Sequence, residues 1–481
     1  MNKIGLAYVK GAVSGLENFG NLPTDLIKSN GLLNGNPISE ELDVLILPGG
    51  SLIESGDISE NFKKEIIKMA NDGKPIIGIC AGFQLLSNKL DVGDESNNDG
   101  LGLIDVYFSP LTLSEHLKAK VYPNSFLTEG ITEDINGYHT HNFGKVEGDG
   151  KPLFYSKSSE GLIFSGASSD DGNVIGTMIH NILDENPNIV KNLLDYIDVK
   201  DVNQIYEANK QLKIDLNKEI GVSSNIPIAE LENPFLEFKK EEGKSPRFLM
   251  ISSTDAYAKE GKSFFTIGLA GALRKQGLNV GLLKIGKDVT DLIPALYLTK
   301  GVMENYTSID AGFGGWVNIN EAIASLKESN YDIILIEGMG CVCNDTMMFA
   351  NQDFKICSET KIPLLLVSSV KGDLVTGLLY SLKSLNQGSL EFYNFEIAGA
   401  LFNHIKNNEI KAELEDGLSD KKIKNSFFLP EIEEVTKLKY DVYGEKLLEV
   451  VSENINIIEI ANITKSIWGE KMALDLSPEK V

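Results

Sequence analysis

The most restrictive feature of this sequence is an alternation of short apolar runs with amphipathic stretches, which occurs in both halves of the chain. In the first half, residues 43–47 form an apolar run that ends in Pro-Gly-Gly, residues 58–70 carry apolar side chains at helical spacing, and residues 74–79 form a second run. Strands that alternate with helices predict a parallel sheet with helices on both faces.

The second half begins the alternation again. A helix is expected at residues 263–275, and near-continuous apolar runs of the kind found in sheets buried on both faces lie at residues 248–251, 279–285, 332–336, 363–367 and 397–402. The chain of 481 residues is long enough for two cores of this kind. We therefore predict an α/β protein with two doubly wound domains.

The segment between the two halves has a different composition. It is rich in Asn, Lys, Glu and Ser, and residues 237–244 form a charge run. We interpret it as a solvated connector with some helix in its first part. The predicted domains are residues 1–197 and 246–481, with a polar linker at 198–245.

The charge balance limits the partners of this chain. The 45 basic and 69 acidic residues give a net charge of -24, which repels polyphosphate backbones and argues against nucleic acid. Because Arg247 and Arg274 are the only arginines, an anionic ligand would be held mainly by backbone N–H groups, lysines and metal. The four cysteines, the lack of a signal peptide and the lack of an apolar run of about 18 residues predict a cytoplasmic protein without a membrane span.

The sharpest local motif is a cysteine between a predicted strand and a predicted helix, in the sequence Gly-Ile-Cys-Ala-Gly-Phe-Gln at residues 78–84. Small residues permit a tight turn that lifts the Cys80 side chain above the sheet, and the positive end of the new helix favours a thiolate. Backbone N–H groups of Gly49, Gly50 and Ala81 could hold a tetrahedral oxyanion. The alternative is an inert buried thiol.

A thiolate nucleophile requires a base, and the sequence offers five histidines. His180 follows an apolar run at residues 174–179, where a base could lie beside Cys80. His139 and His141 lie in the run Gly-Tyr-His-Thr-His. From the residues alone, each could instead be a surface or core histidine.

These motifs, together with Gly-Leu-Gly-Leu-Ile-Asp at residues 100–105, give most of residues 1–195 a resemblance to the triad-type glutamine amidotransferase domain of cobyric acid synthase and cobyrinic acid a,c-diamide synthase. The resemblance implies that Cys80 is the nucleophile and His180 the base. It also implies that Gly49, Gly50, Ala81, Gln84 and His141 form the oxyanion and glutamine site.

The third member of the implied triad is open. The position two residues after the histidine, where the acid of such triads lies, is Ile182. The acid is therefore absent or comes from elsewhere in the chain. Asp184 is one candidate.

The second half contains Gly-Lys-Ser at residues 261–263, between a predicted strand and a predicted helix. This is where a phosphate-binding loop lies: backbone N–H groups and Lys262 contact phosphate, and Ser263 can ligate Mg²⁺. The loop has Ala256 where the usual pattern has a glycine, and Glu260 precedes Gly261.

Polar residues also follow other predicted strands of this half, at the edge where α/β sheets bind ligands. Glu337 ends one strand and is suited to Mg²⁺. Lys284, Asp288 and Asp291 lie at the end of another, and Asn403 closes a late strand, where it could contact an adenine edge.

This half resembles the dethiobiotin-synthetase-like ATP domain of the same synthases, with a longer phosphate loop and with the order of the two domains reversed. The resemblance implies ATP and Mg²⁺. It assigns Asp255, Glu337 and Asp288 to the metal, Lys262 to phosphate, and Lys284 and Asp291 to the substrate end. Cys341 and Cys343, which have no counterpart there, could bind a metal, but no partner pair is evident.

The expected function is glutamine-dependent, ATP-driven amidation of a carboxylate. By resemblance, the acceptor is an acid side chain of a tetrapyrrole, either a corrin or a nickel tetrapyrrole precursor. The alternatives are the same chemistry on another carboxylate, and a non-catalytic or regulatory paralogue with a degenerate phosphate loop. The oligomeric state is also open, with a homodimer among the alternatives.

Overall fold

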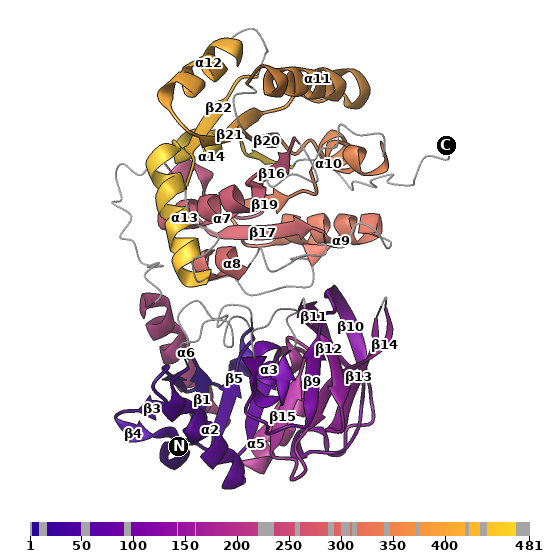
Figure 1. The fold of residues 1–481 in the computed structure, drawn as a ribbon, viewed down its shortest axis with the longest axis vertical. Helices are drawn as coiled ribbons and strands as arrows, with labels where there is room; N and C mark the ends of the chain where they lie inside the picture. Colours follow the sequence, from indigo (N-terminus) through magenta and orange to yellow (C-terminus); the bar gives the residue numbers. More distant parts are fainter. Residues whose placement is uncertain are drawn as a thin grey trace.

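The structure of this protein is a computed structural model. It describes residues 2–8, 17–49, 58–90, 98–141, 143–158, 160–219, 235–254, 260–286, 293–299, 308–309, 315–340, 347–370, 375–418, 423–432 and 440–467. Two α/β units lie end to end, with the first half of the chain in one and the second half in the other (Figure 1). This confirms the predicted fold class.

The first unit contains a nine-stranded mixed sheet in the order β11-β10-β13-β14-β15-β6-β5-β1-β2. Five strands are parallel: β1 (Ile4–Ala7), β2 (Asp25–Ile27), β5 (Val44–Leu47), β6 (Ile76–Ile79) and β15 (Val174–Thr177). The remaining strands extend the sheet in antiparallel pairing: β10 (Leu113–Val121), β11 (Ile135–His141), β13 (Lys151–Ser158) and β14 (Gly161–Ser168).

Short elements complete this unit. A small sheet contains β7 (Lys89–Leu90), β8 (Asn98–Asp99), β9 (Val106–Ser109) and β12 (Lys145–Gly148), and a hairpin pairs β3 (Leu32–Leu33) with β4 (Asn36–Pro37). The helices and turns are α1 (Ile38–Glu41), α2 (Glu60–Asn71), α3 (Ala81–Leu86), α4 (Ile182–Glu185), α5 (Pro187–Tyr196), α6 (Val202–Glu219), η1 (Phe19–Asn21) and η2 (Phe126–Thr128).

Local sequence explains why the helix predicted at residues 58–70 forms. The Ser59 side chain accepts a hydrogen bond from Phe62 N at 3.1 Å and so caps the first turn of α2. Phe62, Ile66 and Met69 lie on one face of the helix and are fully buried.

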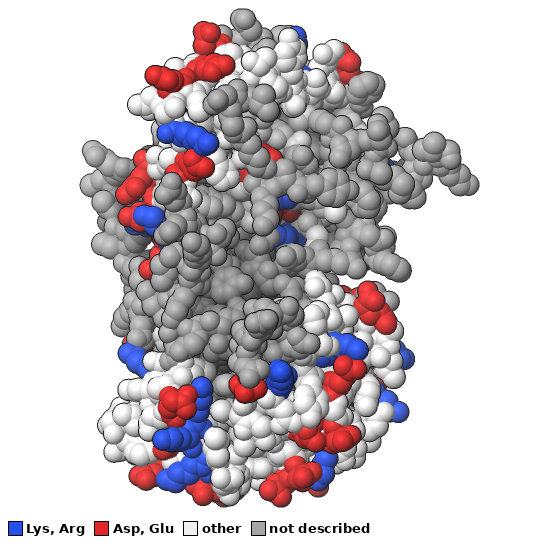
Figure 2. Space-filling view, viewed as in Figure 1, with Lys and Arg blue, Asp and Glu red and all other residues white. Residues whose placement is uncertain are grey.

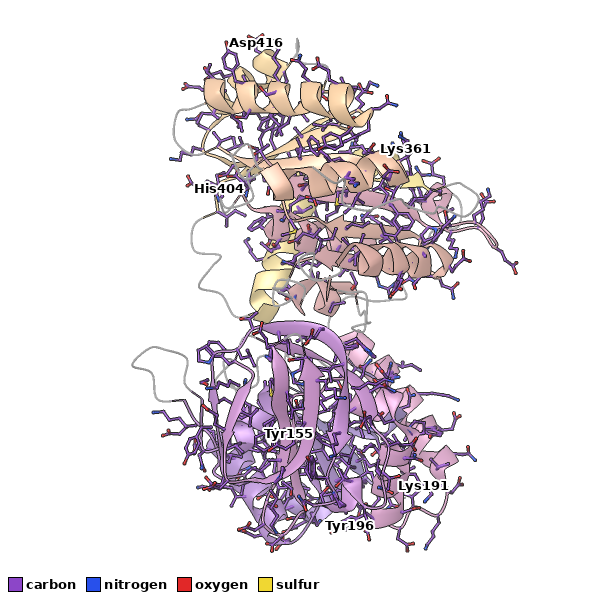
Figure 3. The ribbon with its side chains drawn as sticks, turned by 90° about the vertical axis from the view of Figure 1, so that its right-hand side faces the viewer. Tyr155, Lys191, Tyr196, Lys361, His404 and Asp416 are labelled. Carbon is purple, nitrogen blue, oxygen red and sulfur yellow. The ribbon has the colours of Figure 1, made fainter. Side chains whose placement is uncertain are left out.

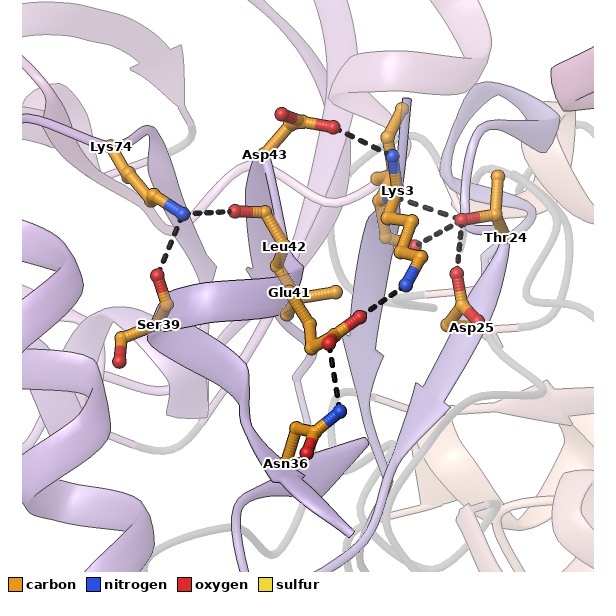
Figure 4. A network of polar contacts seen from close by, with 10 residues as sticks. Lys3, Thr24, Asp25, Asn36, Ser39, Glu41, Leu42, Asp43 and Lys74 are labelled. Atoms are coloured by element: carbon orange, nitrogen blue, oxygen red, sulfur yellow. Dashed lines mark hydrogen bonds and ion pairs between the residues drawn. The ribbon is translucent and has the colours of Figure 1, made fainter. Parts of the chain in front are cut away.

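The amino-terminal ends of the parallel strands are joined by a polar network (Figure 4). Asp43 Oδ2 accepts a hydrogen bond from Lys3 N at 2.8 Å, and the Lys3 ammonium pairs with Glu41. Lys74 Nζ donates to the carbonyl oxygens of Ser39 and Leu42, both at 2.7 Å. These contacts fasten the sheet at the edge opposite to the one where Cys80 follows β6.

The second unit contains a parallel sheet in the order β18-β17-β19-β16-β20-β21-β22. The strands are β16 (Arg247–Ser253), β17 (Val280–Ile285), β18 (Ser308–Ile309), β19 (Ile333–Glu337), β20 (Leu364–Ser369), β21 (Gly399–Ile405), β22 (Ser426–Pro430) and the antiparallel β23 (Lys465–Ser466). The helices and turns are α7 (Lys262–Lys275), α8 (Ile293–Thr299), α9 (Gly315–Glu328), α10 (Met347–Thr360), α11 (Val375–Tyr393), α12 (Asn408–Leu418), α13 (Tyr440–Asn454), α14 (Ile457–Ile463) and η3 (Leu236–Phe238).

The two described parts of the predicted linker attach to different units. In α6, the Asn209 side chain donates to Pro23 O of the first unit at 2.8 Å. Near the second unit, Asp332 accepts hydrogen bonds from Lys240 N at 2.7 Å and from Lys239 Nζ at 3.0 Å. Much of the expected linker is therefore built into the two units.

The side view in Figure 3 shows the same end-to-end arrangement, with Tyr155, Lys191 and Tyr196 on the first unit and Lys361, His404 and Asp416 on the second. On the face drawn in Figure 2, acidic and basic side chains of the described residues are interspersed over the first unit. Within the described ranges, no helix combines the length and apolar character needed to cross a membrane.

Candidate active site

Cys80 occupies a strained turn between β6 and α3. Its backbone has φ 51° and ψ -108°, a conformation that is rare for a residue with a side chain. The neighbouring glycines make room for this turn, since a Cβ at Gly82 would lie 2.1 Å from Leu47 O and one at Gly78 would lie 2.6 Å from Gly82 O. The thiol is partly exposed, and its Sγ lies 4.0 Å from Thr140 O.

The structure brings His180 to Cys80. β15 pairs in parallel with β6, so the residues that follow the two strands lie at the same edge of the sheet. Gly49 packs against both side chains: a Cβ added there would lie 2.8 Å from His180 Cε1 and 3.3 Å from Cys80 Cβ. The residues predicted as nucleophile and base are therefore neighbours.

The acid that contacts His180 is Glu17. Its Oε1 lies 2.5 Å from His180 Nδ1, and its Oε2 accepts a hydrogen bond from Asn181 N at 3.0 Å. Both side chains are buried, with exposed fractions of 4% for Glu17 and 1% for His180. A thiol, an imidazole and a carboxylate, the groups that a nucleophile–base–acid triad requires, thus lie in one place.

The ionisation of His180 fits this arrangement. Burial lowers the pKa of its imidazole, but the negative charge of Glu17 and the interactions with Cys80 outweigh burial and raise the pKa to about 10. The imidazole is therefore protonated at neutral pH. A protonated imidazole at this place can give its proton to a leaving group.

Asp184 has a different role from the one considered for it. Its carboxylate accepts hydrogen bonds from Asn18 N at 2.8 Å and from Gly20 N at 2.6 Å, while Glu17 occupies the position against His180. Ile182, which stands where such triads have their acid, is a fully buried apolar residue.

Sequence reasoning did not find Glu17, because it follows a different strand from the histidine and belongs to no motif. Its only sequence signal is its place among the residues that follow β1, which is parallel to β5 and β6 at the same sheet edge.

Two of the residues predicted for the oxyanion and glutamine site, Ala81 and Gln84, lie in α3. Ala81 opens α3, so its amide lies in the first turn, where helical N–H groups have no intrahelical acceptor. Gln84 is buried, and its side-chain amide donates to Phe143 O at 2.9 Å, which anchors the chain just after β11. Gly50 lies outside the described residues.

His141 belongs to a buried chain of hydrogen bonds. Its Nδ1 lies 2.8 Å from Leu111 O, which can only accept, so Nδ1 carries the proton and Nε2 is an acceptor. His139 Nδ1, at 2.7 Å, must then donate to His141 Nε2, and Ser156 Oγ, at 3.4 Å, can donate to His139 Nε2. Burial lowers the pKa of His141 to about 4 and that of His139 well below its usual value, so both are neutral.

The second unit gathers the predicted phosphate-loop residues. Gly261 has φ +86° and precedes α7, and Lys262 donates to Gly338 O. Ser263 Oγ donates to Glu337 Oε1 at 2.8 Å. The buried Lys284 lies 3.1 Å from the same carboxylate oxygen.

Asn403 also reaches this loop. It is buried, its Nδ2 lies 3.4 Å from Glu260 O, and its Oδ1 accepts from His404 N at 2.9 Å. A Cβ at Gly261 would lie 2.0 Å from Asn403 Nδ2, so the two residues are in close contact. In this structure the amide of Asn403 therefore lies against Glu260 and Gly261, directly before α7.

These contacts fit a Mg²⁺–nucleotide. Ser263 and Glu337 place hydroxyl and carboxylate oxygens, which are the ligands Mg²⁺ prefers, next to an ammonium and a helix N-terminus. The remaining predicted residues, Asp255, Asp288, Asp291, Cys341 and Cys343, lie outside the described residues. In the part of the chain that is described, no group of three or more His, Cys, Asp or Glu residues could hold a metal.

Sequence reasoning also missed Asp353 on α10. It is fully buried and accepts hydrogen bonds from Ser252 Oγ at 2.6 Å, Gly340 N at 3.0 Å and Met339 N at 3.2 Å. It therefore fixes the chain that follows Glu337. An acid in the middle of a helix carries no sequence signal for this role.

The sequence of the first unit matches a known family of domains. Residues 18–188 match the CobB/CobQ-like glutamine amidotransferase domain. The first unit contains such a domain, and Glu17 lies directly before the matched segment.

Curated relatives show partial similarity. The chain is 29% identical to the cobyric acid synthase of Clostridium perfringens over 211 residues, which is 40% of each chain. It is 34% identical to the cobyric acid synthase of Clostridium botulinum strain Alaska E43 over 154 residues, which is 30% of each chain. It is 31% identical to a probable cobyric acid synthase of Methanothermobacter thermautotrophicus over 155 residues, which is 30% of this chain and 31% of the other. The matches span about 40% or less of the length of these relatives.

Two solved structures each align with less than half of the chain. A glutamine amidotransferase aligns with 41% of this chain and 99% of its own, at 19% identity and a TM-score of 0.30. The MinD cell division protein of Aquifex aeolicus aligns with 45% of this chain and 94% of its own, at 18% identity and a TM-score of 0.32.

Proposed function

We propose that this protein hydrolyses glutamine in its first unit and uses the ammonia to amidate a carboxylate in its second unit, at the cost of ATP. The observation that carries the proposal is that Cys80, His180 and Glu17 lie together at one edge of the sheet, with Glu17 bonded to His180 and Gly49 packed against both His180 and Cys80. The match of residues 18–188 to a glutamine amidotransferase domain supports the same chemistry.

In the first unit, the Cys80 thiolate attacks the side-chain carbonyl carbon of glutamine. Backbone N–H groups near Ala81 and Gly49 stabilise the oxyanion, and the His180 imidazolium gives its proton to the leaving nitrogen. Ammonia leaves and a thioester remains on Cys80. Water then attacks the thioester, with His180 as the base, and glutamate is released.

In the second unit, a carboxylate must be activated, because a carboxylate anion is a poor electrophile. Transfer of the γ-phosphoryl group of ATP to the carboxylate gives an acyl phosphate and ADP. Ammonia attacks the acyl carbon and inorganic phosphate leaves. Lys262 would contact the phosphates, and Ser263 and Glu337 would hold Mg²⁺, which neutralises phosphate charge.

The packing of the two units supports transfer of ammonia between them. Tyr8, which follows β1, and Tyr138 of β11 are buried in the same apolar cluster as residues of the second unit. Tyr138 also exchanges backbone hydrogen bonds with His180, at 2.7 and 3.2 Å. His180 is therefore paired directly with a residue that lies at the contact between the two units.

For the acceptor, we propose an acid side chain of a tetrapyrrole, by analogy with the cobyric acid synthases. The domain order would be the reverse of theirs. Another carboxylate would use the same machinery. Glutamate release that increases when ATP and a tetrapyrrole acid are added, together with an amidated product by mass spectrometry, would support the tetrapyrrole. An increase only with other acids would exclude it.

A second candidate is a binding or regulatory role for the second unit. The observation that favours it is that Lys262 bonds Gly338 O, and Glu337 bonds Ser263 and Lys284, so that these groups already have partners in the protein. Nucleotide would raise the melting temperature of an ATP-dependent ligase and leave that of a degenerate unit unchanged.

The decisive test separates the two units. Cys80→Ser should abolish glutamine-supported amidation and leave ammonia-supported amidation intact. Equal loss of both activities in a folded variant would contradict the assignment of nitrogen donation to the first unit.

A further inference from the structure

Glu17, which contacts His180, is followed in the chain by an unusual turn. The three residues of η1 all have positive φ: Phe19 at 52°, Gly20 at 65° and Asn21 at 56°. This conformation is unfavourable for Phe and tolerated by Asn. Such a turn persists only where surrounding contacts hold it, and strained turns of this kind cluster at functional sites.

One set of contacts that hold this turn comes from the segment directly after His180. Asp184, on α4 just after His180, accepts hydrogen bonds from Asn18 N at 2.8 Å and Gly20 N at 2.6 Å. The same turn packs closely here, since a Cβ at Gly20 would lie 3.2 Å from Leu183 O. The turn that carries Glu17 is therefore tied to the segment that carries His180.

The second set comes from α6, which belongs to the predicted linker. Lys213 Nζ donates to Asn18 Oδ1 at 2.9 Å and to Asn21 Oδ1 at 2.6 Å, so that one ammonium bridges both ends of the turn. Burial lowers the pKa of Lys213, and the charge of Asp184 opposes this. α6 is itself fixed to the first unit by the bond of Asn209 to Pro23 O at 2.8 Å.

We propose that Lys213 and Asp184 are positioning residues that hold the Glu17 turn against His180. Neither touches the reacting atoms; both act through Glu17. Because α6 leads from the first unit towards the second, the connector between the units contributes a residue to the glutaminase machinery. The inference rests on the proposed glutaminase function of the first unit.

The test compares Lys213→Met with Lys210→Met in the full-length chain. Lys210 is a matched control on the same helix, because its side chain is exposed and pairs with Glu207 of that helix. The readouts are kcat and KM for glutamate release, and the pH profile of Cys80 alkylation by iodoacetamide, followed by peptide mass analysis. We expect Lys213→Met to lower kcat about 10-fold or more with little change in KM, since small misplacements of catalytic groups cost this much.

The pH profile distinguishes positioning from a general loss of stability. In Lys213→Met the alkylation profile of Cys80 should move towards that of Glu17→Gln, whereas Lys210→Met should match the wild type. Lys213→Arg, which keeps the charge and the donors, should restore most of the activity. Asp184→Asn should show the same loss as Lys213→Met.

Two outcomes separate this inference from the proposed function. If the wild type releases no glutamate, the proposed function fails, and the alkylation profiles still decide whether Lys213 positions Glu17. If Lys213→Met keeps wild-type kcat and an unchanged profile, the inference is overturned. Should Lys213→Met not fold, Asn21→Gly removes one acceptor and suits the positive φ; wild-type kcat and profile in that variant would equally overturn it.

Discussion

Glu17 Oε1 lies 2.5 Å from His180 Nδ1, although 163 residues separate the two in the chain. Sequence spacing alone could not pair them, because the contact depends on β1 and β15 ending at the same edge of one sheet. The pair orients the imidazole towards Cys80 and keeps it protonated.

Glu17→Gln tests the role of this acid. The amide cannot hold the imidazolium, so we expect glutamate release to fall about 10²–10⁴-fold, as when the acid of a hydrolytic triad is replaced by its amide. Steady-state kcat is the measurement. Glu185→Gln is the control, because it breaks a second Glu–His pair, with His116 at 3.0 Å, on the more exposed surface. Equal losses in the two variants would count against a catalytic pair.

The raised pKa of His180 predicts how stability depends on pH. A group whose pKa is higher in the folded than in the unfolded state stabilises the fold fully below the unfolded pKa, and this contribution is lost as pH rises through the folded pKa. For His180 these limits are 6.5 and about 10. The stability of the wild type relative to His180→Gln should therefore be greatest near pH 6 and decline from pH 7 to pH 10. Urea unfolding at several pH values measures it, and a difference that grows with pH would refute the assignment.

Gly49→Ala tests the close packing of the catalytic side chains. The new methyl group would lie 2.8 Å from His180 Cε1, so we expect the imidazole to be displaced and kcat to fall about 10-fold or more. Gly377→Ala on α11, where a Cβ meets nothing within 4 Å, is the control and should keep full activity. A fully active Gly49→Ala would show that the imidazole does not depend on this contact.

Lys262→Ala tests the second unit. It should lose nucleotide-dependent stabilisation in a thermal shift, because the ammonium that neutralises phosphate is removed, while Cys80 still reacts with a glutamine-analogue electrophile. Lys275→Ala, at the other end of α7, should behave as the wild type. If nucleotide still raises the melting temperature of Lys262→Ala, the phosphate-loop assignment does not hold.

The sequence predicted those parts of the site that lie within one motif. Cys80 with its flanking glycines, and Gly261 with Lys262, could be recognised because strand, turn and helix follow one another locally. Glu17 and Asp353 could not, since each acts on a segment far along the chain. Gln84 is a third case. Its position in the helix after Cys80 could be predicted, but its hydrogen bond to Phe143 O depends on the course of the chain after β11.

The places of Glu17, Cys80 and His180 along the chain also determine when the three side chains can meet during synthesis. Glu17, Cys80 and His180 come from the beginning, middle and end of the first unit, and His180 arrives only when β15 has joined β6. During synthesis the thiol of Cys80 therefore exists for about a hundred residues of chain growth before its imidazolium partner is made. A chain interrupted before β15 has Cys80 without His180, so the glutamine hydrolysis that we propose requires the completed unit.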